Sequence, residues 1–483
     1  MAEISGLNPV LGHRVVTLVP QVHGGLLAAE DMFKELERLD WPWIDLVCVD
    51  FHPLEEEIAH VGATSASVIE KTDIGGPTML RSGAKGRRIV IADPTDRDRV
   101  IAWLKAGEPD SEEFRNELAA KAEGIVARYC LASGRYHSGG RIDGVIGTQV
   151  AACKYGENPW QDNAALYDTG TDDPLALSRF GLVDGDAPSY INLSDVDRLL
   201  QTMTHVAAAI AANDLPVPAI AVGVKHGNPC GTAVSLGGRG ALLGMLMGDP
   251  LAIFGGFVMT NFPFDQALAY TLRHVDGSSQ KRLFDGVVAP WFTADAREEL
   301  HRKGGKCRLW KNEALDRLSL ASLDRADRFR YVRGGFLRQP NYTYVLGFDD
   351  PDLVISGVLM REQRINLLLA WAIGSTSNSN TITLVKDGML VGNGVGQQDR
   401  VGAASLAIER ARRSGHDLRG AVAYSDSFFP FPDGPQALID AGVSVILATS
   451  GSVNDNATRE VCRNAGVTLV LIPDKKARGF FGH

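Results

Sequence analysis

A lysine and a histidine stand side by side at the end of an apolar run. The run PAIAVGV (218–224) precedes Lys225 and His226, and GNPCG (227–231) follows them. The apolar run predicts a buried strand, and the Gly-Asn-Pro-Cys-Gly stretch predicts a tight turn. Histidine can exchange a proton near neutral pH, and a neighbouring ammonium can stabilise developing negative charge. The residues fit either an acid–base site or a structural turn with an exposed basic pair.

The six cysteines give no sign of a metal site or a disulfide framework. They are scattered along the chain and form no CxxC pair. Free thiols in a reducing compartment are therefore expected, and no metal is predicted. Cys230, beside the basic pair, could act as a nucleophile, but a small residue that packs in the turn is the favoured interpretation.

Length and composition indicate a multidomain globular protein. The chain has 483 residues with 45% hydrophobic and 22% charged residues, which predicts two or three ordinary domains. A net charge of −9 argues against non-specific nucleic-acid binding. The sequence contains neither an apolar run long enough for a membrane span nor a secretory leader. We therefore expect a cytoplasmic protein.

The first part of the chain shows an alternating strand and helix pattern. Residues 44–50 and 88–94 are apolar runs typical of buried strands. Residues 73–85 begin with glycines and turn helical, and residues 97–131 have helical periodicity. The polar, glycine-rich stretch 134–144 indicates a domain boundary.

From about residue 145 a second pattern runs twice. Residues 218–231 form a strand and a turn, and a small-residue helix and a strand at 252–260 follow. Residues 381–400 repeat the strands and the glycine-rich turn, and a helix (AASLAIERARR) and a strand (GAVAYSDSFFPF) again follow. This order predicts two similar α/β units that pack around one site.

Several segments in register resemble the transformylase part of the AICAR transformylase/IMP cyclohydrolase family. The segments are KHGNPCG (225–231), KYGENPWQ (154–161), IFGGFVMTN (253–261), DGVVAPWF (285–292), NSNTI (378–382), GVGQQDRV (394–401), SDSFFPF (425–431), SGSVND (450–455) and the tail RGFFGH. Any one of them is weak, but together they span about 335 residues in the family's order.

The resemblance implies a role for each matching residue. His226 would take a proton from the attacking amine, Lys225 would polarise the formyl oxygen, and Asn380 would orient the amine or carboxamide. Arg400 would bind the carboxamide end of the ribotide, and Asp285 would hold the ribose or amine side from a partner subunit. The other implied substrate contacts are Phe254, Gly255, Phe428, Pro430 and Asp433 at the base and folate pocket, Lys154 and Tyr155 from the partner at the phosphate, Lys303 at the phosphate, and Arg478 and His483 in the tail.

Structural alternatives exist for these residues when they are considered singly. Arg400 could be a solvated charge at a helix start, and Asp285 could be an acid in a turn. The phenylalanines of SDSFFPF could be core residues, and GVGQ could be a structural glycine turn. Their place among the other matching segments favours the site.

Residues 12–130 resemble the family's cyclohydrolase domain, with specific departures. Arg14, Asp73 and Lys85 stand at matching positions, but Val16 and Val19 replace a lysine and a histidine of the family pattern. His52 replaces a tyrosine, and the family's opening stretch of about 60 residues is absent. Because valine can neither stabilise charge nor transfer a proton, we expect this site to be vestigial and cyclohydrolase activity to be lost or weak. The alternative is that His52 and Lys85 rebuild a working site.

The resemblance also implies an architecture. It implies an α/β protein with a truncated methylglyoxal-synthase-like domain at 1–140 and two cytidine-deaminase-like α/β units of the AICAR transformylase type at 145–325 and 326–483. It implies a homodimer with shared active sites, an AICAR-type ribotide as substrate and 10-formyltetrahydrofolate as co-substrate. No nucleic acid and no membrane are expected as partners.

Four other functions are weighed against the transformylase. A paralogue could bind a ribotide without turnover, or a specialised formyltransferase could act on an AICAR analogue. A zinc deaminase would need an H-x-E and a P-C-x-x-C motif, and here Pro229-Cys230 has no second cysteine after it. An ATP-using formate ligase is disfavoured because no Walker-type GK[ST] loop is present.

Overall fold

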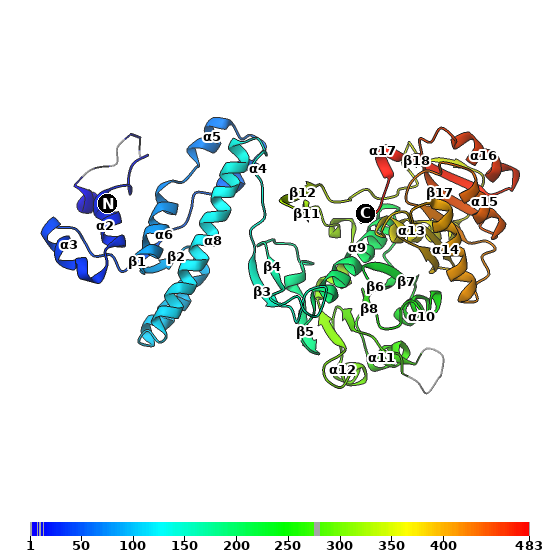
Figure 1. Cartoon of the computed structure of the whole chain (residues 1–483), viewed down its shortest axis with the longest axis horizontal. Helices are drawn as coiled ribbons and strands as arrows, with labels where there is room; N and C mark the ends of the chain where they lie inside the picture. The colour runs from blue at the N-terminus through cyan, green and yellow to red at the C-terminus, as the bar shows by residue number, and fades with distance from the viewer. Residues whose placement is uncertain (1, 7, 9–10, 13, 275–280, 483) are drawn as a thin grey trace. The chain divides into compact units, whose positions relative to one another are not determined.

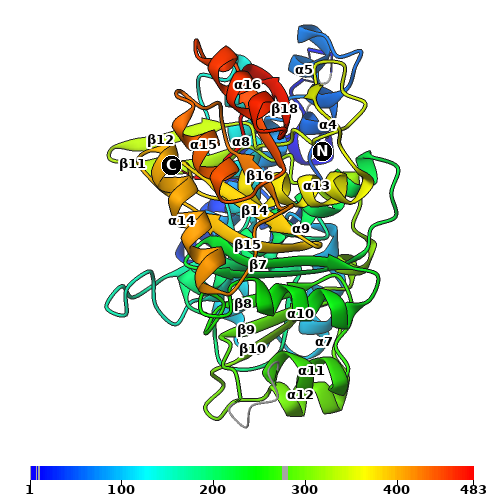
Figure 2. The ribbon, with the colours of Figure 1, turned by 90° about the vertical axis from the view of Figure 1, so that its right-hand side faces the viewer.

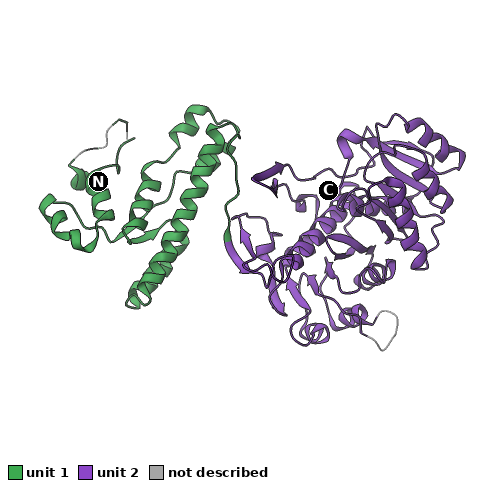
Figure 3. Ribbon diagram, in the orientation of Figure 1, with its two compact units in different colours: residues 1–148 green, residues 149–483 purple. Residues whose placement is uncertain are grey.

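The computed structural model describes residues 2–6, 8, 11–12, 14–274 and 281–482. The chain divides into two compact units, residues 1–148 and 149–483 (Figures 1 and 3). None of the described helices is both long and apolar enough to cross a membrane. The further division of the second unit at residue 325 stays a prediction.

The first unit is built on a small parallel sheet. Strands β1 (Leu46–Cys48) and β2 (Ile89–Ile91) pair in register, and α6 (Gly75–Lys85) and α8 (Ser111–His137) pack beside them. The expected helix at 97–131 is instead two helices, α7 (Arg97–Lys105) and α8, because the linker between them takes positive φ angles at three positions, including a glycine. The other elements are α1 (Ala2–Ser5), α2 (Pro20–Leu27), η1 (Glu30–Met32), α3 (Phe33–Leu39), α4 (Leu54–Ala59), α5 (Ser65–Glu70) and η2 (Pro94–Asp96).

The second unit is built on one mixed sheet of twelve strands. Its order, which Figure 2 follows from β16 to β10, is β13-β18-β17-β16-β14-β15-β7-β6-β8-β9-β10-β5. The strands, in that order, are Val354–Ser356, Thr468–Pro473, Val445–Ser450, Val422–Ser425, Ile382–Lys386, Met389–Gly394, Asn228–Ser235, Ala219–Lys225, Phe257–Thr260, Gly286–Ala289, Arg308–Lys311 and Gly181–Asp184. Two hairpins lie outside this sheet, β3 (Thr148–Ala152) with β4 (Ala165–Asp168) and β11 (Arg328–Val332) with β12 (Gly335–Gln339).

The order of elements in this unit repeats. The first copy runs α9-β6-β7-α10-β8-α11-β9-α12-β10, and the second runs α13-β14-β15-α14-β16-α15-β17-α16-β18. In each copy the first two strands form a hairpin, the next strand pairs antiparallel with the first, and the last two continue in parallel. The copies meet where β7 pairs antiparallel with β15. The internal similarity expected from the sequence is therefore present as a duplicated topology.

Helices cover both faces of the sheet. Helices α9 (Tyr190–Ala212) and α13 (Arg361–Ser375) share a core with one face, where Ile220, Val222 and Val224 are buried. Ala221, between them, belongs to a core on the other face, as the two-residue period of a strand requires. The helices of that other face are α10 (Gly238–Gly248), α11 (Gln266–Arg273), α12 (Ala294–Leu300), α14 (Arg400–Arg413), α15 (Asp433–Asp440) and α16 (Asp455–Asn464).

The strand predicted over 252–260 is shorter than expected. Strand β8 begins at Phe257, and Gly255 takes a φ of 77° in the turn before it. The apolar pattern continues through this turn because Ile253 is fully buried against Gly223 of β6. Burial, and not strand geometry, accounts for its hydrophobic character.

Candidate functional site

The directions of the strands bring the predicted transformylase residues to one edge of the twelve-stranded sheet. Strand β6 ends at this edge, and β8 and β9 begin there. In the second copy β14 begins and β15 and β16 end at the same edge. Because β6 and β14 are separated by three strand spacings, the two sets of loops start about 14 Å apart at the level of the strands.

Lys225 and His226 lie at the tip of the hairpin between β6 and β7. Lys225 pairs with Asn228, so His226 and Gly227 are the two residues of the turn, with φ angles of 54° and 68°. Two consecutive positive φ angles are the geometry that suits the twist of a two-residue hairpin. The turn thus fixes His226 at the edge of the sheet, in a backbone conformation that is uncommon for histidine.

Three segments of the first copy meet around this tip. The Lys225 Nζ donates a hydrogen bond to the carbonyl oxygen of Phe254 over 2.7 Å. Burial raises the pKa of Asp285, and the positive charges of Arg302, Arg308, Lys225 and His226 oppose that rise. Asp285 therefore lies within electrostatic range of Lys225 and His226 of its own chain.

In the second copy Asn380 and Arg400 are both held by neighbours. The Asn380 Nδ2 donates to the carbonyl oxygen of Gln397 over 2.8 Å. The Arg400 Nη2 donates to Asp426 Oδ1 over 3.1 Å, and the Asp426 carboxylate, which is fully buried, also accepts from Ser379. Burial raises the pKa of Asp426, and the charge of Arg400 opposes the rise. Arg400 is thus anchored at its position by a buried carboxylate.

Direct hydrogen bonds join the two copies at this edge. The Asn378 backbone N–H donates to Asn228 Oδ1 over 3.1 Å, and the Asn393 Nδ2 donates to the carbonyl oxygen of Pro229 over 3.0 Å. The loop that carries Asn380 is therefore tied to the strand that follows the His226 turn.

Helix α9 contributes the buried guanidinium of Arg198 to the same edge of the sheet. Arg198, 7% exposed, donates to the carbonyl oxygens of Thr376 and Phe481 and to Asn378 Oδ1. Its guanidinium lies 4.2 Å from the centre of the Phe481 ring. One side chain thus connects the central helix, the loop before β14 and the C-terminal tail.

A cavity of about 320 Å³ adjoins the basic pair. The buried Asp249 and Arg410 form an ion pair in its wall over 3.1 Å. Asn380 and Arg400 are not part of its lining, so this cavity belongs mainly to the first copy and to β15. The lining residues are Lys225, His226, Asn228, Pro229, Cys230, Asp249, Leu251, Ala252, Leu390, Gly392, Asn393, Val395 and Arg410.

Three of the residues expected at the base and folate pocket, Phe428, Pro430 and Asp433, follow β16, and the tail residue Arg478 follows β18. The Arg478 guanidinium lies 5.7 Å from the ring centre of Phe428 and pairs with Asp474 over 2.5 Å. The carbonyl oxygen of Pro430 accepts from Asn454 over 2.6 Å, and Asp433 begins α15. His483, expected in the tail, lies outside the described residues.

Lys154, Tyr155 and Lys303 are distant from the His226 turn along the sheet. The Lys154 Nζ pairs with Asp186 over 2.7 Å, just after β5. Strand β5 is four strand spacings from β6, or about 19 Å. Tyr155 accepts from the Tyr190 N–H nearby, and Lys303 is exposed in the turn before β10.

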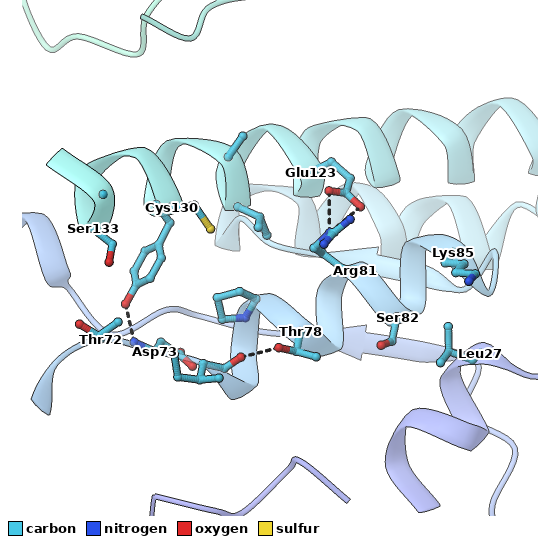
Figure 4. Close-up of a pocket in the computed structure, with 16 residues that line it drawn as sticks. Leu27, Thr72, Asp73, Thr78, Arg81, Ser82, Lys85, Glu123, Cys130 and Ser133 are labelled. Carbon is cyan, nitrogen blue, oxygen red and sulfur yellow. Dashed lines mark hydrogen bonds and ion pairs between the residues drawn. The ribbon is translucent and has the colours of Figure 1, made fainter. Parts of the chain in front are cut away.

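In the first unit two adjoining cavities contain the predicted vestigial residues. Arg14, His52 and Asp73 line a cavity of about 680 Å³. Asp73 and Lys85 line a second cavity of about 900 Å³, where Figure 4 shows them at opposite ends. Ten residues of helix α6 separate Gly75 from Lys85, a rise of about 15 Å. His52 lines the first of these cavities and Lys85 the second, and Asp73 borders both.

Several residues that build the site were missed by the sequence reasoning. Asp195 accepts the Gly227 N–H, Arg198 holds the loop before β14, and Asp426 anchors Arg400. Asp426 lies inside a matching segment and could have been singled out as an acid among apolar residues. Asp195 and Arg198 carry no local signal. Among the residues that the structure describes, no group of three or more His, Cys, Asp or Glu could hold a metal ion.

Comparison with known proteins identifies the family. A protein-family model described as "AICARFT/IMPCHase bienzyme" matches residues 85–410. The "Bifunctional purine biosynthesis protein PurH" of Shouchella clausii (strain KSM-K16) is 34% identical over 494 residues, covering 98% of this chain and 89% of that protein. The protein of the same name from Trichormus variabilis (strain ATCC 29413 / PCC 7937) is 33% identical, with the same coverage. A solved structure described as "Crystal structure of ForH" is 34% identical over 29% of this chain and 75% of that chain, with a TM-score of 0.26. The chain belongs to the AICARFT/IMPCHase bienzyme family.

Proposed function

We propose that this protein is a folate-dependent formyltransferase that transfers a formyl group from 10-formyltetrahydrofolate to the amine of AICAR. The observation that supports the proposal is that the loops carrying two sets of predicted side chains lie at one sheet edge and are hydrogen-bonded to each other. Lys225 and His226 come from one copy of the repeat, Asn380 and Arg400 come from the other, and Asn228 and Asn378 are hydrogen-bonded between them. The family relatives are bifunctional purine biosynthesis proteins by name.

The chemistry needs a base and a cation next to the reacting carbon. The AICAR amine attacks the formyl carbon, and His226 accepts the proton that the amine loses. The carbonyl oxygen becomes an oxyanion, which the Lys225 ammonium stabilises. The bond from the formyl carbon to N10 then breaks, and N10 takes up a proton as tetrahydrofolate leaves. The products are the formylated ribotide and tetrahydrofolate, without a covalent enzyme intermediate.

The remaining residues would align the two substrates. Asn380 would orient the amine or carboxamide, Arg400 would bind the carboxamide, and Asp285 would hold the ribose or amine side of the ribotide. Phe254, Gly255, Phe428, Pro430 and Asp433 would line the base and folate pocket. Alignment of two reactants on one surface accounts for much of the rate of such transfers. Phosphate contacts would come from Lys154, Tyr155 and Lys303, and the tail residues Arg478 and His483 would make further substrate contacts.

The cyclohydrolase step is proposed to be lost or very weak. Val16 lines the cavity of Arg14 and His52 and Val19 is buried nearby in the sequence, and valine supplies neither charge nor a proton. The formylated ribotide is the direct probe: its ring closure should proceed at no more than about a hundredth of the formyl-transfer rate. Ring closure at a rate comparable to formyl transfer would show that His52 and Lys85 sustain this reaction.

The architecture is proposed to follow the family. The first unit would be a methylglyoxal-synthase-like domain, and the two copies of the repeat would be cytidine-deaminase-like units of the transformylase type. The protein would act in the cytoplasm as a homodimer whose sites are shared between subunits.

A paired substitution at the two hairpin tips tests the transferase. Asp387 occupies the same turn position in the second copy as His226 in the first. With AICAR and 10-formyltetrahydrofolate, release of tetrahydrofolate should fall by about 10²- to 10⁴-fold in His226→Ala and stay near the wild-type rate in Asp387→Ala. Wild-type protein that binds AICAR without turnover would support the non-catalytic paralogue, and turnover of only an analogue would support the specialised enzyme.

A further inference from the structure

The duplicated fold contains the same helix-to-turn hydrogen bond twice. In the first copy Asp195 Oδ1 accepts the N–H of Gly227 over 2.7 Å. In the second copy Asn366 Oδ1 accepts the N–H of Gly388 over 2.8 Å. Asp195 and Asn366 each lie five residues after the first residue of their helices, α9 and α13. These two side chains are therefore structural counterparts.

The two turns that they hold are also counterparts. His226 and Gly227 have φ angles of 54° and 68°, and Asp387 and Gly388 have 51° and 73°. Each turn has two residues and follows a strand that ends in lysine. A residue other than glycine in this left-handed conformation costs about 1 kcal/mol or more, so a side chain that holds the turn has the same structural task in both copies.

The neutral amide of Asn366 shows that this task does not require a charge. Asn366 is 8% exposed and holds the second turn with an amide oxygen as closely as Asp195 holds the first with a carboxylate. The side chain that holds the turn is negatively charged only in the first copy, where the turn itself carries a histidine. In the other copy the turn carries Asp387, beside which a second carboxylate would be repelled.

The charges around His226 are mixed, and Asp195 is the one that touches its turn. Burial raises the pKa of Asp195, while the Gly227 hydrogen bond and the charge of His226 oppose that rise. Lys225 on β6 and Asp285 before β9 also face His226, Arg198 faces Asp195, and Arg302 and Arg308 face Asp285. Asp195 and Asp285 are the two negative charges in this group.

We propose that Asp195 is a positioning residue for His226, which fixes the turn through Gly227 and whose negative charge stabilises the imidazolium that forms when His226 accepts a proton. The inference rests on the proposed formyl transfer, in which that proton comes from the attacking amine. The carboxylate acts through the turn and through space, in the manner of the acid that orients a catalytic histidine. It takes up no proton from the substrate.

The substitution Asp195→Asn copies the arrangement of the second repeat into the first. The asparagine oxygen can still accept the Gly227 N–H, so the fold and the turn should be kept while the charge is lost. We expect the plateau of kcat/KM for formyl transfer to fall about tenfold, and its acid limb to move to lower pH by about half a unit to one unit.

The reciprocal variant Asn366→Asp is the matched control. Its turn lies at the far edge of the sheet, six residues of β15 or about 20 Å away, beyond the screening length of about 8 Å, so the pH profile should stay in place.

A measurement without turnover separates this inference from the proposed function. The 11 histidines can be labelled and titrated by NMR, with the His226 signal assigned from its absence in His226→Asn. The imidazole of His226 should titrate at lower pH in Asp195→Asn than in wild type, whereas Asp197→Asn, on the same helix, should leave it unchanged. A wild-type protein without formyltransferase activity would refute the proposed function and leave this readout valid. If the titration of His226 is the same in wild type and Asp195→Asn, the inference is overturned.

Discussion

At the scale of single residues, the duplicated fold places a lysine at the same position in both copies, so Lys225 can be compared with Lys386. Lys225 ends β6 and donates to the carbonyl oxygen of Phe254 over 2.7 Å. Lys386 ends β14 and donates to the carbonyl oxygen of Asp417 over 2.8 Å. Both acceptors lie in the loop between the helix and the third strand of their copy. The two lysines thus have the same structural role, at opposite edges of the sheet.

The proposed catalytic role of Lys225 predicts a difference between these two lysines. Lys225→Met removes the cation beside the developing oxyanion, so kcat should fall about 10²- to 10³-fold with little change in KM. Lys386→Met removes an equivalent hydrogen bond without reaching the site and should retain kcat. Steady-state kinetics with AICAR and 10-formyltetrahydrofolate measure both. Equal losses in the two variants would mean that Lys225 acts only by holding the Phe254 loop.

At the scale of elements helix α9 carries two side chains that hold the loops of the site. It begins with a capping box in which Ser189 and Asn192 satisfy each other's backbone N–H groups. Asp195 and Arg198, three residues apart, lie on one face of the helix. Asp195 holds the turn of the first copy, and Arg198 holds the loop before β14 of the second copy. One helix therefore sets the relative positions of the two halves of the site.

Loss of Arg198 should reduce both stability and substrate alignment. Arg198→Met leaves the carbonyl oxygens of Thr376 and Phe481 without their donor, which should cost about 2–3 kcal/mol of unfolding free energy. Because Asn380 follows Asn378 closely in the freed loop, KM for AICAR should rise as well. Arg198→Lys should recover part of both effects, and Arg325→Met, at an exposed position, should show neither. Thermal or denaturant unfolding together with kinetics would decide, and an Arg198→Met protein with wild-type stability would contradict the role.

Many of the strands, turns and helices that carry the site could be predicted from the sequence, because they depend on local patterns of residues. The strand that ends at Lys225, the turn after it and the repeated order of elements follow from apolar runs and glycine positions. The residues that hold the turns could not be found in this way, since Asp195 is 32 residues from Gly227 and Arg198 is 178 residues from Thr376. Their partners are set by tertiary packing. The prediction of a strand over 252–256 is wrong because Ile253 is buried in a turn. A buried turn residue is apolar for the same reason as a buried strand residue, so the sequence pattern does not separate the two.

At the scale of the whole molecule the proposed reactions belong to separate units. The residues proposed for formyl transfer lie in 149–483, which has its own buried cores, and the vestigial residues lie in 1–148. Of the proposed contacts, Lys154 pairs with Asp186 just after β5, four strand spacings or about 19 Å from β6 along the sheet. The loop after β16 that carries Phe428 and Pro430 starts equally far from β6 on the other side. We propose that Lys154 reaches the site from a second subunit, as the resemblance to the family implies.

Mixing two inactive variants tests whether subunits share a site. Lys154→Ala and His226→Ala should each be inactive alone. After the variants are unfolded and refolded together, half of randomly formed dimers are mixed, and each mixed dimer regains one intact site of two if Lys154 arrives from the partner. Activity should then return to about a quarter of wild type, in proportion to the mixed dimers. If Lys154 instead serves His226 of its own chain, every site in the mixture retains a defect and no activity returns. Sedimentation at the assay concentration supplies the control, because a monomeric protein could not complement at all.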